Sequence, residues 1–475
     1  MRHPDELSRR RALALGTAAA GFTILPPQVL GRGRVLAPSE KMNLAFIGCG
    51  MAGRTQINEM ASQNIVALCD VDWRESSGGR GMIGTAASLA KKYPSARRFD
   101  DWRVMLQEMD KQIDGVVVST PDHTHAQAVL TAMKMGKHVF CEKPLGISVQ
   151  ENRAMMAAEK KHKKVITSTC VQGHASEDCR AIVEWVRDGA IGDVREAHVY
   201  EYETIRPGSP SYYDDLKHIQ DDVPVPPELN WDLWLGPAPS RPFNSMYHPN
   251  RWRYWYDFGA GKLGDHGPHY IDPIAWALDL GLPETIEAVG TDAEWDTVAD
   301  KTQKYPRFAV VRYGFPARGK KPPVTLTWHH NDKMPPLTKW WKAEDKPPTG
   351  GGIIVGTSGA IVFGPIYASK PGAMQQVKLI PEELNRDYKR PARTIPRIDT
   401  SHWMEWVECA KAGKPTSADF AYGGIISEIA LLGDIAIRNK GKLLRYDAKR
   451  GRFADSEANQ FLQRPSYRKG FELPA

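Results

Sequence analysis

Three side chains of this sequence are suited to moving a proton between a hydroxyl group and the protein. Lys143 follows an apolar run at residues 138–141, so its ammonium is expected in a low-dielectric cleft, where burial lowers the pKa of a lysine. Asp265 and His269 lie four residues apart at the start of a predicted helix, and therefore on one helix face. An imidazole held by a carboxylate has the near-neutral pKa that removal of a hydroxyl proton requires.

The same residues allow other interpretations. Lys143 could form a surface salt bridge with Glu142, and Asp265 could cap a helix in whose core His269 is packed. Metal binding would use ligands at helical spacing, namely His266, His269 and Asp272. We expect no metal site, and the six cysteines contain no CxxC pair, which indicates buried thiols rather than a disulfide framework or a zinc site.

Residues 41–170 predict the framework that would position these side chains. Short apolar runs alternate here with amphipathic segments. Continuous apolar strands that alternate with helices indicate a parallel sheet covered by helices on both faces. The expected strands are residues 43–47, 65–69, 113–119, 138–141 and 165–168.

A glycine-rich turn follows the first of these strands. Gly48, Gly50 and Gly53 form a GxGxxG pattern that opens a helix at about residues 53–62, and Asp70 ends the second strand. Gly48 permits the tight turn, Gly50 the close approach of backbone to a pyrophosphate, and Gly53 the close packing of helix and strand. In this context the pattern predicts a dinucleotide-binding Rossmann domain; the alternative is a structural remnant without a cofactor.

The carboxylate of Asp70 bears on which dinucleotide is bound. It would accept hydrogen bonds from ribose hydroxyls and repel a 2′-phosphate, which favours NAD over NADP. Arg74 and Arg80 follow closely and weaken this preference. NAD is the expected cofactor, with NADP as the alternative.

Residues 171–475 predict a second domain of α+β type. An amphipathic helix near residues 176–188 precedes segments in which apolar and polar residues alternate, which is typical of strands with one solvent-exposed face. The expected strands are residues 194–202, 307–315, 324–329, 353–355 and 360–363. The predicted fold class is therefore α/β, with a Rossmann domain at residues 41–170 followed by an α+β domain with an open, largely antiparallel sheet.

Residues 1–40 are similar to a twin-arginine secretory signal. Arginines at positions 9–11 precede an apolar stretch at residues 12–25 and a spacer that ends in small residues. The stretch is too short for a comfortable membrane span, and no other segment approaches eighteen apolar residues. We expect export to the periplasm and no membrane span in the mature protein; an uncleaved extension or a tether is the alternative.

The composition excludes several classes of protein. Hydrophobic residues make up 41% and charged residues 25% of the chain, which is typical of globular proteins and not of disordered or coiled-coil chains. Residues 1–40 supply +3 of the formal net charge of +7, and the remaining charges are mixed in sign along the chain. The sequence therefore predicts no clustered basic surface for a nucleic acid.

Further motifs resemble those of one enzyme family. STPDHTH at residues 119–125 follows the third strand and CEKPL at residues 141–145 follows the fourth. Other matching segments are VQGH at 171–174, WDLWLGP at 231–237, GKLGDHGPHYID at 261–272 and a late helix around 402–406. With the glycine turn these resemble the Gfo/Idh/MocA family of dehydrogenases over nearly the whole chain after the leader. The leader, the Trp-rich segments and the RKGF tail at 468–471 are most similar to its secreted bacterial branch.

The resemblance implies roles for individual residues. Glu142 and Lys143 correspond to the family signature at the junction of the two domains, with Lys143 reaching the reacting hydroxyl. Asp265 and His269 correspond to an Asp-x-x-x-His pair in which the histidine acts as general base or binds the substrate hydroxyl and the aspartate orients it, and Gln172 is implied in substrate binding. The residues implied in cofactor binding are Gly48, Gly50, Gly53, Asp70, Thr120, Pro121, His123 and Glu142. A capping role of Asp122 or Thr124 explains part of that motif without a ligand.

The combined prediction is an NAD(P)-dependent oxidoreductase that transfers hydride between a carbohydrate or polyol carbon and nicotinamide. An exported protein has no free NAD pool, so its cofactor should be tightly bound and recycled. An NAD-dependent glycoside hydrolase that acts by oxidation, elimination and re-reduction is one alternative, and a non-catalytic sugar-binding protein is another. A homo-oligomer is expected from the resemblance only. Aromatic residues before the Asp265 helix could stack on a sugar or belong to the core: Trp252, Tyr254, Trp255 and Tyr256.

Overall fold

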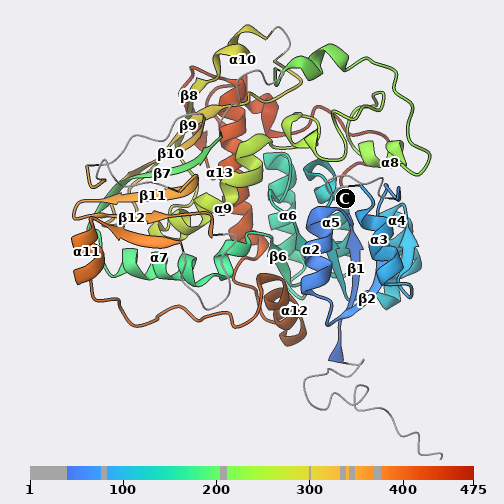
Figure 1. Cartoon of the computed structure of the whole chain (residues 1–475), viewed down its shortest axis with the longest axis horizontal. Coiled ribbons are helices and arrows are strands. Elements are labelled where there is room, and N and C mark those ends of the chain that lie inside the picture. The colour runs from blue at the N-terminus through green and yellow to red at the C-terminus, as the bar shows by residue number, and fades with distance from the viewer. Residues whose placement is uncertain are drawn as a thin grey trace, which may run out of the picture.

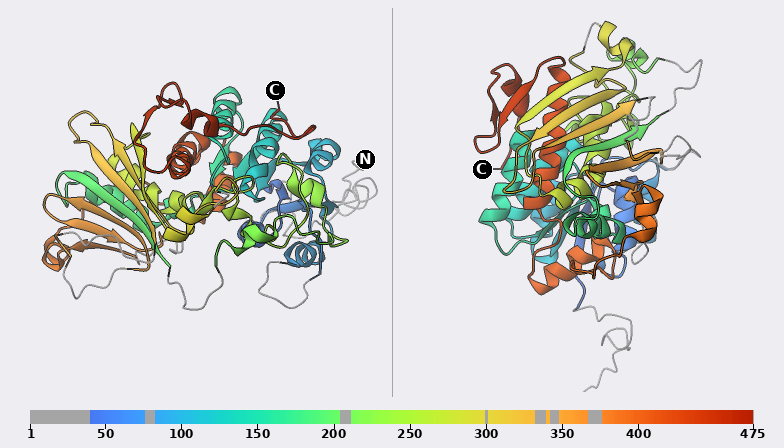
Figure 2. Two further views of the ribbon diagram at one scale, coloured as in Figure 1. Left: turned by 90° about the horizontal axis from the view of Figure 1, so that it is seen from above. Right: turned by 90° about the vertical axis from the view of Figure 1, so that its left-hand side faces the viewer.

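The computed structural model describes residues 40–75, 83–203, 211–298, 301–331, 339–341, 348–366 and 376–474. The predicted leader up to residue 39 and Arg80 lie outside these residues. Two β-sheets lie at opposite ends of the molecule with long helices between them (Figures 1 and 2).

The first sheet is the predicted Rossmann sheet. Its six strands are all parallel and lie in the order β3-β2-β1-β4-β5-β6. The strands are β1 (Asn43–Ile47), β2 (Asn64–Cys69), β3 (Arg97–Phe99), β4 (Gly115–Val118), β5 (His138–Cys141) and β6 (Thr167–Thr169). The helices between them are α2 (Met51–Glu59), α3 (Thr85–Lys92), α4 (Trp102–Glu108), α5 (His125–Lys134) and α6 (Val149–Lys161). The short strand β3 was not predicted, because Phe99 is its only buried residue.

Both faces of this sheet are buried, as its continuous apolar strands require. One face includes Ala45, Ile47 and Val118. The opposite face includes Phe46 and Phe140 and packs on α12 (His402–Ala412). A helix from the far end of the chain therefore completes the Rossmann core.

The second sheet is open and largely antiparallel, as predicted. Its strand order is β13-β12-β11-β7-β10-β9-β8-β14-β15, and only β7 and β10 pair in parallel. Its strands are β7 (Val194–Tyr202), β8 (Thr285–Thr291), β9 (Ala309–Phe315), β10 (Val324–Asn331), β11 (Gly350–Gly356), β12 (Ala360–Phe363), β13 (Val377–Ile380), β14 (Leu444–Asp447) and β15 (Arg452–Phe453). The strands β8, β13, β14 and β15 were not predicted, because each buries only one or two apolar side chains.

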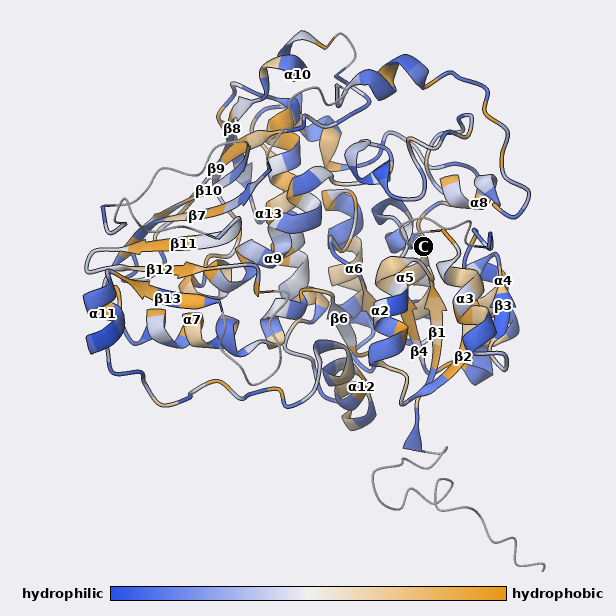
Figure 3. Ribbon diagram, in the orientation of Figure 1, coloured by the Kyte–Doolittle hydropathy of each residue, from blue (hydrophilic) through white to orange (hydrophobic). Residues whose placement is uncertain are grey.

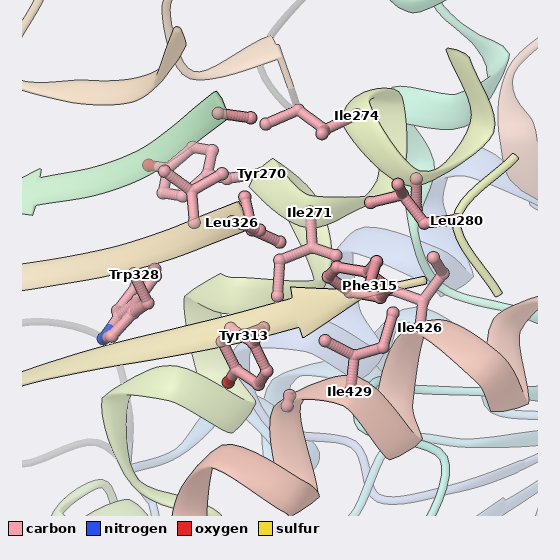
Figure 4. Packing of buried hydrophobic residues seen from close by; sticks show 14 of the residues in the cluster. Tyr270, Ile271, Ile274, Leu280, Tyr313, Phe315, Leu326, Trp328, Ile426 and Ile429 are labelled. Atoms are coloured by element: carbon pink, nitrogen blue, oxygen red, sulfur yellow. The ribbon is translucent and has the colours of Figure 1, made fainter. Parts of the chain in front are cut away.

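One face of this sheet packs on α9 and α13 (Figure 4). Alternate residues of β9 and β10, such as Tyr313 and Leu326, meet Ile271 of α9 and Ile429 of α13. The helices of this part are α7 (Glu177–Arg187), α8 (Trp231–Leu235), α9 (Gly261–Leu278), α10 (Ala293–Thr297), α11 (Glu382–Asp387) and α13 (Phe420–Arg438). Figure 3 shows apolar residues concentrated on the inner strands of both sheets, whereas α11 is polar.

Helix α13 is long and apolar enough to cross a membrane by length and composition, but 83% of its apolar window is buried inside the protein. Its side chains belong to the core between the sheet and α9. Burial by protein on this scale is what a core helix shows.

Residues 226–260, which we call the crossover segment, come between β7 and α9 in the chain and lie against the Rossmann domain, where α8 is seen in Figure 1. The backbone N–H of Asn230 donates to the carbonyl of Val71 (2.8 Å), and that of Trp73 donates to the carbonyl of Glu228 (3.1 Å). The segment has an apolar cluster of its own, with buried residues Leu229, Trp231, Trp234, Leu235, Ala238, Phe243, Met246, Tyr247, Trp252, Trp255 and Phe258. Trp255 is fully buried, so for this residue the core interpretation holds and sugar stacking does not.

Candidate active site

The carboxyl ends of the Rossmann strands and the start of α9 enclose a cleft of about 620 Å³. This volume is in the range of small-molecule and cofactor sites. Of the residues predicted from the sequence, the cleft is lined by Gly48, Gly50, Asp70, Thr120, Pro121, Glu142, Lys143, Gln172, Asp265 and His269. The fold thus brings residues that are more than two hundred positions apart into one cavity.

The glycine turn has the geometry that a dinucleotide requires. Gly48 has a φ of +88°, and a side chain there would meet the backbone of Ser119. At Gly53 a Cβ would lie 2.1 Å from the carbonyl oxygen of Gly48, so only glycine permits this contact between turn and helix. A Cβ at Gly50 would meet nothing within 4 Å, and that open space faces the cleft. The turn therefore fits a bound pyrophosphate.

Asp70 lies beside this turn. Its carboxylate accepts hydrogen bonds from the backbone N–H groups of Cys49 (2.6 Å) and Asp72 (2.9 Å). Burial raises the pKa of Asp70, and these two N–H groups oppose the rise. The next carboxylate, Asp72, binds Arg74 through two hydrogen bonds of 2.8 and 2.6 Å, so the guanidinium of Arg74 is already paired.

Lys143 and Asp265 form an ion pair that the sequence analysis did not predict. The Nζ of Lys143 lies 2.7 Å from both Oδ1 and the backbone oxygen of Asp265. Burial lowers the pKa of Lys143, but the carboxylates of Asp265 and Glu142 outweigh burial, and the pKa is raised. The predicted lowering of this pKa is therefore wrong, because it did not include the Asp265 carboxylate. Lys143 is a cation and is suited to donating a hydrogen bond or a proton.

The remaining members of the site have complementary charge states. Burial opposes ionisation of Asp265, but Lys143 and Arg253, whose Nε lies 3.1 Å from Oδ2, hold the pKa of Asp265 well below its usual range. His269 is buried one turn beyond Asp265 on α9, and burial together with the Lys143 cation holds its pKa well below its usual range. The predicted near-neutral pKa of His269 is therefore wrong, because the Asp265 carboxylate pairs with Lys143 and Arg253. The cleft therefore holds a cationic donor and a neutral imidazole that can accept a proton.

Glu142 is held by a residue that the sequence analysis missed. The Nε2 of Gln56, on α2, donates to Glu142 Oε1 at 2.6 Å, and Ser119 donates to the amide oxygen of Gln56. Gln56 comes three residues after Gly53 in the helix that the glycine turn opens, and this position is the only signal in the sequence. The network connects the turn to the Glu142-Lys143 signature.

His123 and Gly53 are the predicted cofactor residues that do not line the cleft, and Gly53 packs against the turn instead. For His123 the reason is burial. Its side chain is fully buried behind the cleft, where Nε2 lies 2.9 Å from the carbonyl oxygen of Trp234. Burial, and next the Arg464 cation, lower the pKa of His123 to about 3. Its neighbour Asp122 lines the cleft instead, and burial raises the pKa of that carboxyl to about 6.

The metal interpretation of α9 does not match the contacts. His266 pairs with Glu201, its Nδ1 lying 2.5 Å from Oε2, and Asp272 accepts a hydrogen bond from His174 Nδ1 at 2.8 Å. Within the described residues, the group with metal-ligand spacing is a different one: His174, Cys179 and Asp272, all buried. Tyr422 also donates to Asp272, so hydrogen bonds already satisfy this carboxylate.

The fold combines a parallel Rossmann sheet with a second, largely antiparallel sheet, and the cleft lies at the carboxyl ends of the Rossmann strands. A family model described as oxidoreductase family, NAD-binding Rossmann fold, matches residues 42–169, and a model described as oxidoreductase family, C-terminal alpha/beta domain, matches residues 211–307. Both models describe parts of the Gfo/Idh/MocA oxidoreductases, so residues 42–169 and 211–307 are similar to that family.

Curated relatives match over parts of their length. A glycosyl hydrolase family 109 protein from Stenotrophomonas maltophilia is 29% identical over 196 residues, 40% of this chain and 40% of that protein. A levoglucosan dehydrogenase from Pseudarthrobacter phenanthrenivorans is 29% identical over 109 residues, 23% of this chain and 27% of that protein. An inositol 2-dehydrogenase from Salmonella typhimurium is 26% identical over 166 residues, which are 34% of this chain and 46% of that protein. The matched segments span less than half the length of each relative.

Solved structures share the fold over most of the chain. An aldose-aldose oxidoreductase from Caulobacter crescentus, complexed with glycerol, aligns with a TM-score of 0.55 and 17% identity, covering 86% of this chain and 100% of that one. The WlbA dehydrogenase from Bordetella pertussis, in complex with NADH and UDP-GlcNAcA, aligns with a TM-score of 0.54 and 17% identity, covering 86% and 99%. At this identity the likeness concerns the fold alone.

Proposed function

We propose that the protein is an NAD-dependent oxidoreductase that acts on a CH–OH group of a carbohydrate or polyol and retains its dinucleotide between turnovers. The observation that supports this most strongly is the pairing of Lys143 with Asp265, in one cleft with His269 and the glycine turn. The relatives include sugar and polyol dehydrogenases, which agrees with a hydroxyl substrate.

The residues divide the proton chemistry between them. Bound NAD would accept the hydride that leaves the substrate carbon together with the electron pair of its C–H bond. The neutral imidazole of His269 takes the hydroxyl proton as the carbonyl forms. Lys143 donates a hydrogen bond to the same oxygen and stabilises the negative charge that develops there. Asp265 keeps Lys143 charged and fixes its position in the cleft.

The choice of NAD over NADP is supported by the charges beside Asp70. A 2′-phosphate would meet this carboxylate, and Asp72 lies two residues on. Arg74, which could otherwise neutralise a phosphate, is bound by Asp72. Gly50 thus leaves space for the pyrophosphate, and Asp70 provides acceptors for the ribose hydroxyls. Arg74 provides no unpaired cation for a 2′-phosphate.

Export to the periplasm by a twin-arginine signal is part of this proposal and rests on the sequence of residues 1–40. Export of a folded enzyme suits a cofactor that is bound in the cytoplasm and then kept. Homo-oligomer formation through the open face of the second sheet is also proposed, on the family resemblance.

A second candidate is favoured by one finding. Two relatives are glycosyl hydrolase family 109 proteins, from Stenotrophomonas maltophilia and Akkermansia muciniphila. The same cleft would then oxidise a glycoside, eliminate the leaving group and reduce the product, with no net redox change. Lys143 and His269 would serve both hydroxyl oxidation and the reverse step.

Single-turnover experiments test the proposal. Aldoses, inositols and aryl glycosides are added one by one to the purified protein, and the absorbance of reduced nicotinamide is followed. We expect reduction with at least one free sugar or polyol, and none with Lys143→Ala. Release of the aryl group without net reduction would favour the second candidate. Sugar binding that Lys143→Ala leaves unchanged, with no redox response, would instead identify a binding protein.

A further inference from the structure

The crossover segment supplies part of the wall of the candidate dinucleotide site. His248, Pro249, Asn250 and Trp252 line the same cleft as Gly50 and Asp70. The Nε2 of His248 lies 2.7 Å from Oδ2 of Asp72, two residues beyond Asp70. A segment of the second domain therefore faces the glycine turn across the cleft, at the end where a dinucleotide would place its ribose.

The C-terminal tail, residues 464–473, binds the crossover segment through Arg468. Arg468 donates from Nε to the carbonyl of Gly236 and from Nη2 to the carbonyl of Asp232, each at 2.7 Å. Its Nη1 lies 2.6 Å from the Asp232 carboxylate. Gly236 caps the C-terminal end of α8, where a cation is favoured because backbone carbonyls lack helical partners, whereas Asp232 lies in the first turn of this short helix.

The other side of the tail is bound to the Rossmann domain. Arg464 pairs with Glu151 of α6 at 2.8 Å, with the Glu151 side chain fully buried. Arg103 of α4 donates to the carbonyl of Gly470 at 2.9 Å, and its guanidinium lies over the ring of Phe471, 4.3 Å from the centroid. The tail therefore bridges α8 and the nucleotide-binding half of the protein, and Figure 1 shows the C-terminus beside α8 and α5.

Two features indicate that the crossover segment can move as a unit. Its buried apolar residues form a cluster of their own, all between Leu229 and Phe258, and Val71 and His123 of the Rossmann domain contact this cluster from outside. The contacts that hold it to the tail are hydrogen bonds and ion pairs near the surface, such as those of Arg468 with Asp232. Polar, partly exposed contacts of this kind open at lower free energy than an apolar core.

We propose that the crossover segment and the C-terminal tail form a clasp that encloses the dinucleotide site and slows the release of a bound dinucleotide. The proposal rests on the proposed function, since it assigns residues to the retention of that cofactor. His248 and Asn250 are residues of the crossover segment that line the cleft, and Arg468 holds the crossover segment to the tail. Exchange of the dinucleotide requires the contacts of Arg468 to break.

Release of the dinucleotide from the full-length protein tests the clasp. The wild type, Arg468→Ala and the control Arg450→Ala are loaded with NAD⁺ and diluted, and the remaining bound NAD⁺ is quantified by mass spectrometry over time. Arg450 is a suitable control because its side chain is 78% exposed and pairs with Asp447, not with α8. We expect release from Arg468→Ala to be faster by at least about tenfold, because the substitution removes three charge-assisted contacts with α8 and the loss of one such contact corresponds to about that factor, with Arg450→Ala unchanged.

The outcomes separate the clasp from the proposed function. Slow release from the wild type and equally slow release from Arg468→Ala would overturn the clasp and leave cofactor retention standing. Rapid release from the wild type would overturn both retention and the clasp. Arg103→Ala, which removes the tail contacts from the opposite side, is the second variant if Arg468→Ala has a lowered melting temperature. Faster amide exchange in residues 229–258 of either variant is the expected structural readout.

Discussion

The buried imidazole of His123 predicts a specific loss of stability in acid. Its Nε2 faces the carbonyl oxygen of Trp234, an acceptor, so Nε2 carries the proton of the neutral ring. Its Nδ1 is buried, and no hydrogen-bond partner for it occurs within the described part of the chain. A second proton on this ring would therefore be buried without an acceptor, beside the Arg464 cation.

The magnitude follows from the pKa values. The pKa of His123 falls from an ordinary 6.5 to about 3 on folding, so below pH 6.5 the unfolded chain binds a proton that the folded protein excludes. Stability is thus fully present above pH 6.5 and is lost as the pH falls towards 3. At pH 5, about 1.5 pH units below the ordinary value, the loss is about 2 kcal/mol.

Urea denaturation at pH 5 and pH 8 measures this loss. His123→Gln keeps a donor for the Trp234 carbonyl and removes the titrating ring; the ring's packing is lost equally at both pH values. We expect the difference in unfolding free energy between pH 8 and pH 5 to be smaller in His123→Gln than in the wild type by about 2 kcal/mol. His218→Gln, at a side chain that is 57% exposed, is the control and should leave the pH dependence unchanged. An unaltered pH dependence in His123→Gln would refute the reasoning.

Four further substitutions have expected outcomes. Gly53→Ala places a Cβ 2.1 Å from the oxygen of Gly48 and should lower the melting temperature strongly, whereas Gly50→Ala faces open space and should melt like the wild type but bind NAD⁺ more weakly in calorimetry. Asp265→Asn removes the carboxylate that lies 2.7 Å from Nζ of the buried Lys143; the pKa of Lys143 should fall, and mass spectrometry should detect faster acylation of Lys143 near neutral pH. Burial raises the pKa of Asp122 from 3.8 to about 6, so this carboxyl lowers the stability of the folded protein progressively as the pH rises from about 4 to 6. Between pH 4 and pH 8 the unfolding free energy of Asp122→Asn should therefore rise relative to that of the wild type by about 2 kcal/mol, measured by urea denaturation.

Local patterns in the sequence were sufficient for the fold of the nucleotide-binding part. The strand β1 was predicted with its observed limits, and the strand-turn-helix around Gly48 was predicted because Gly48 and Gly53 each meet a local steric requirement. The sequence could not show that α12 covers the Rossmann sheet, because the contact of Trp406 with Phe140 joins residues far apart in the chain.

The site was predicted in its membership but not in its electrostatics. Lys143, Asp265 and His269 reach one cleft, as the spacing and the family resemblance implied. The raised pKa of Lys143 depends on a contact across 122 residues, which no local pattern contains. His123 failed for the same reason, since burial under the crossover segment decides where its ring lies.

The identity of any dinucleotide that the protein carries tests the central claim most directly. The protein is purified without added nucleotide and denatured, and the released material is analysed by mass spectrometry, with Gly50→Ala as the matched control. The account predicts near-stoichiometric NAD(H) from the wild type and much less from Gly50→Ala. A wild-type protein that releases no dinucleotide, and that binds none when NAD⁺ is added, would contradict it.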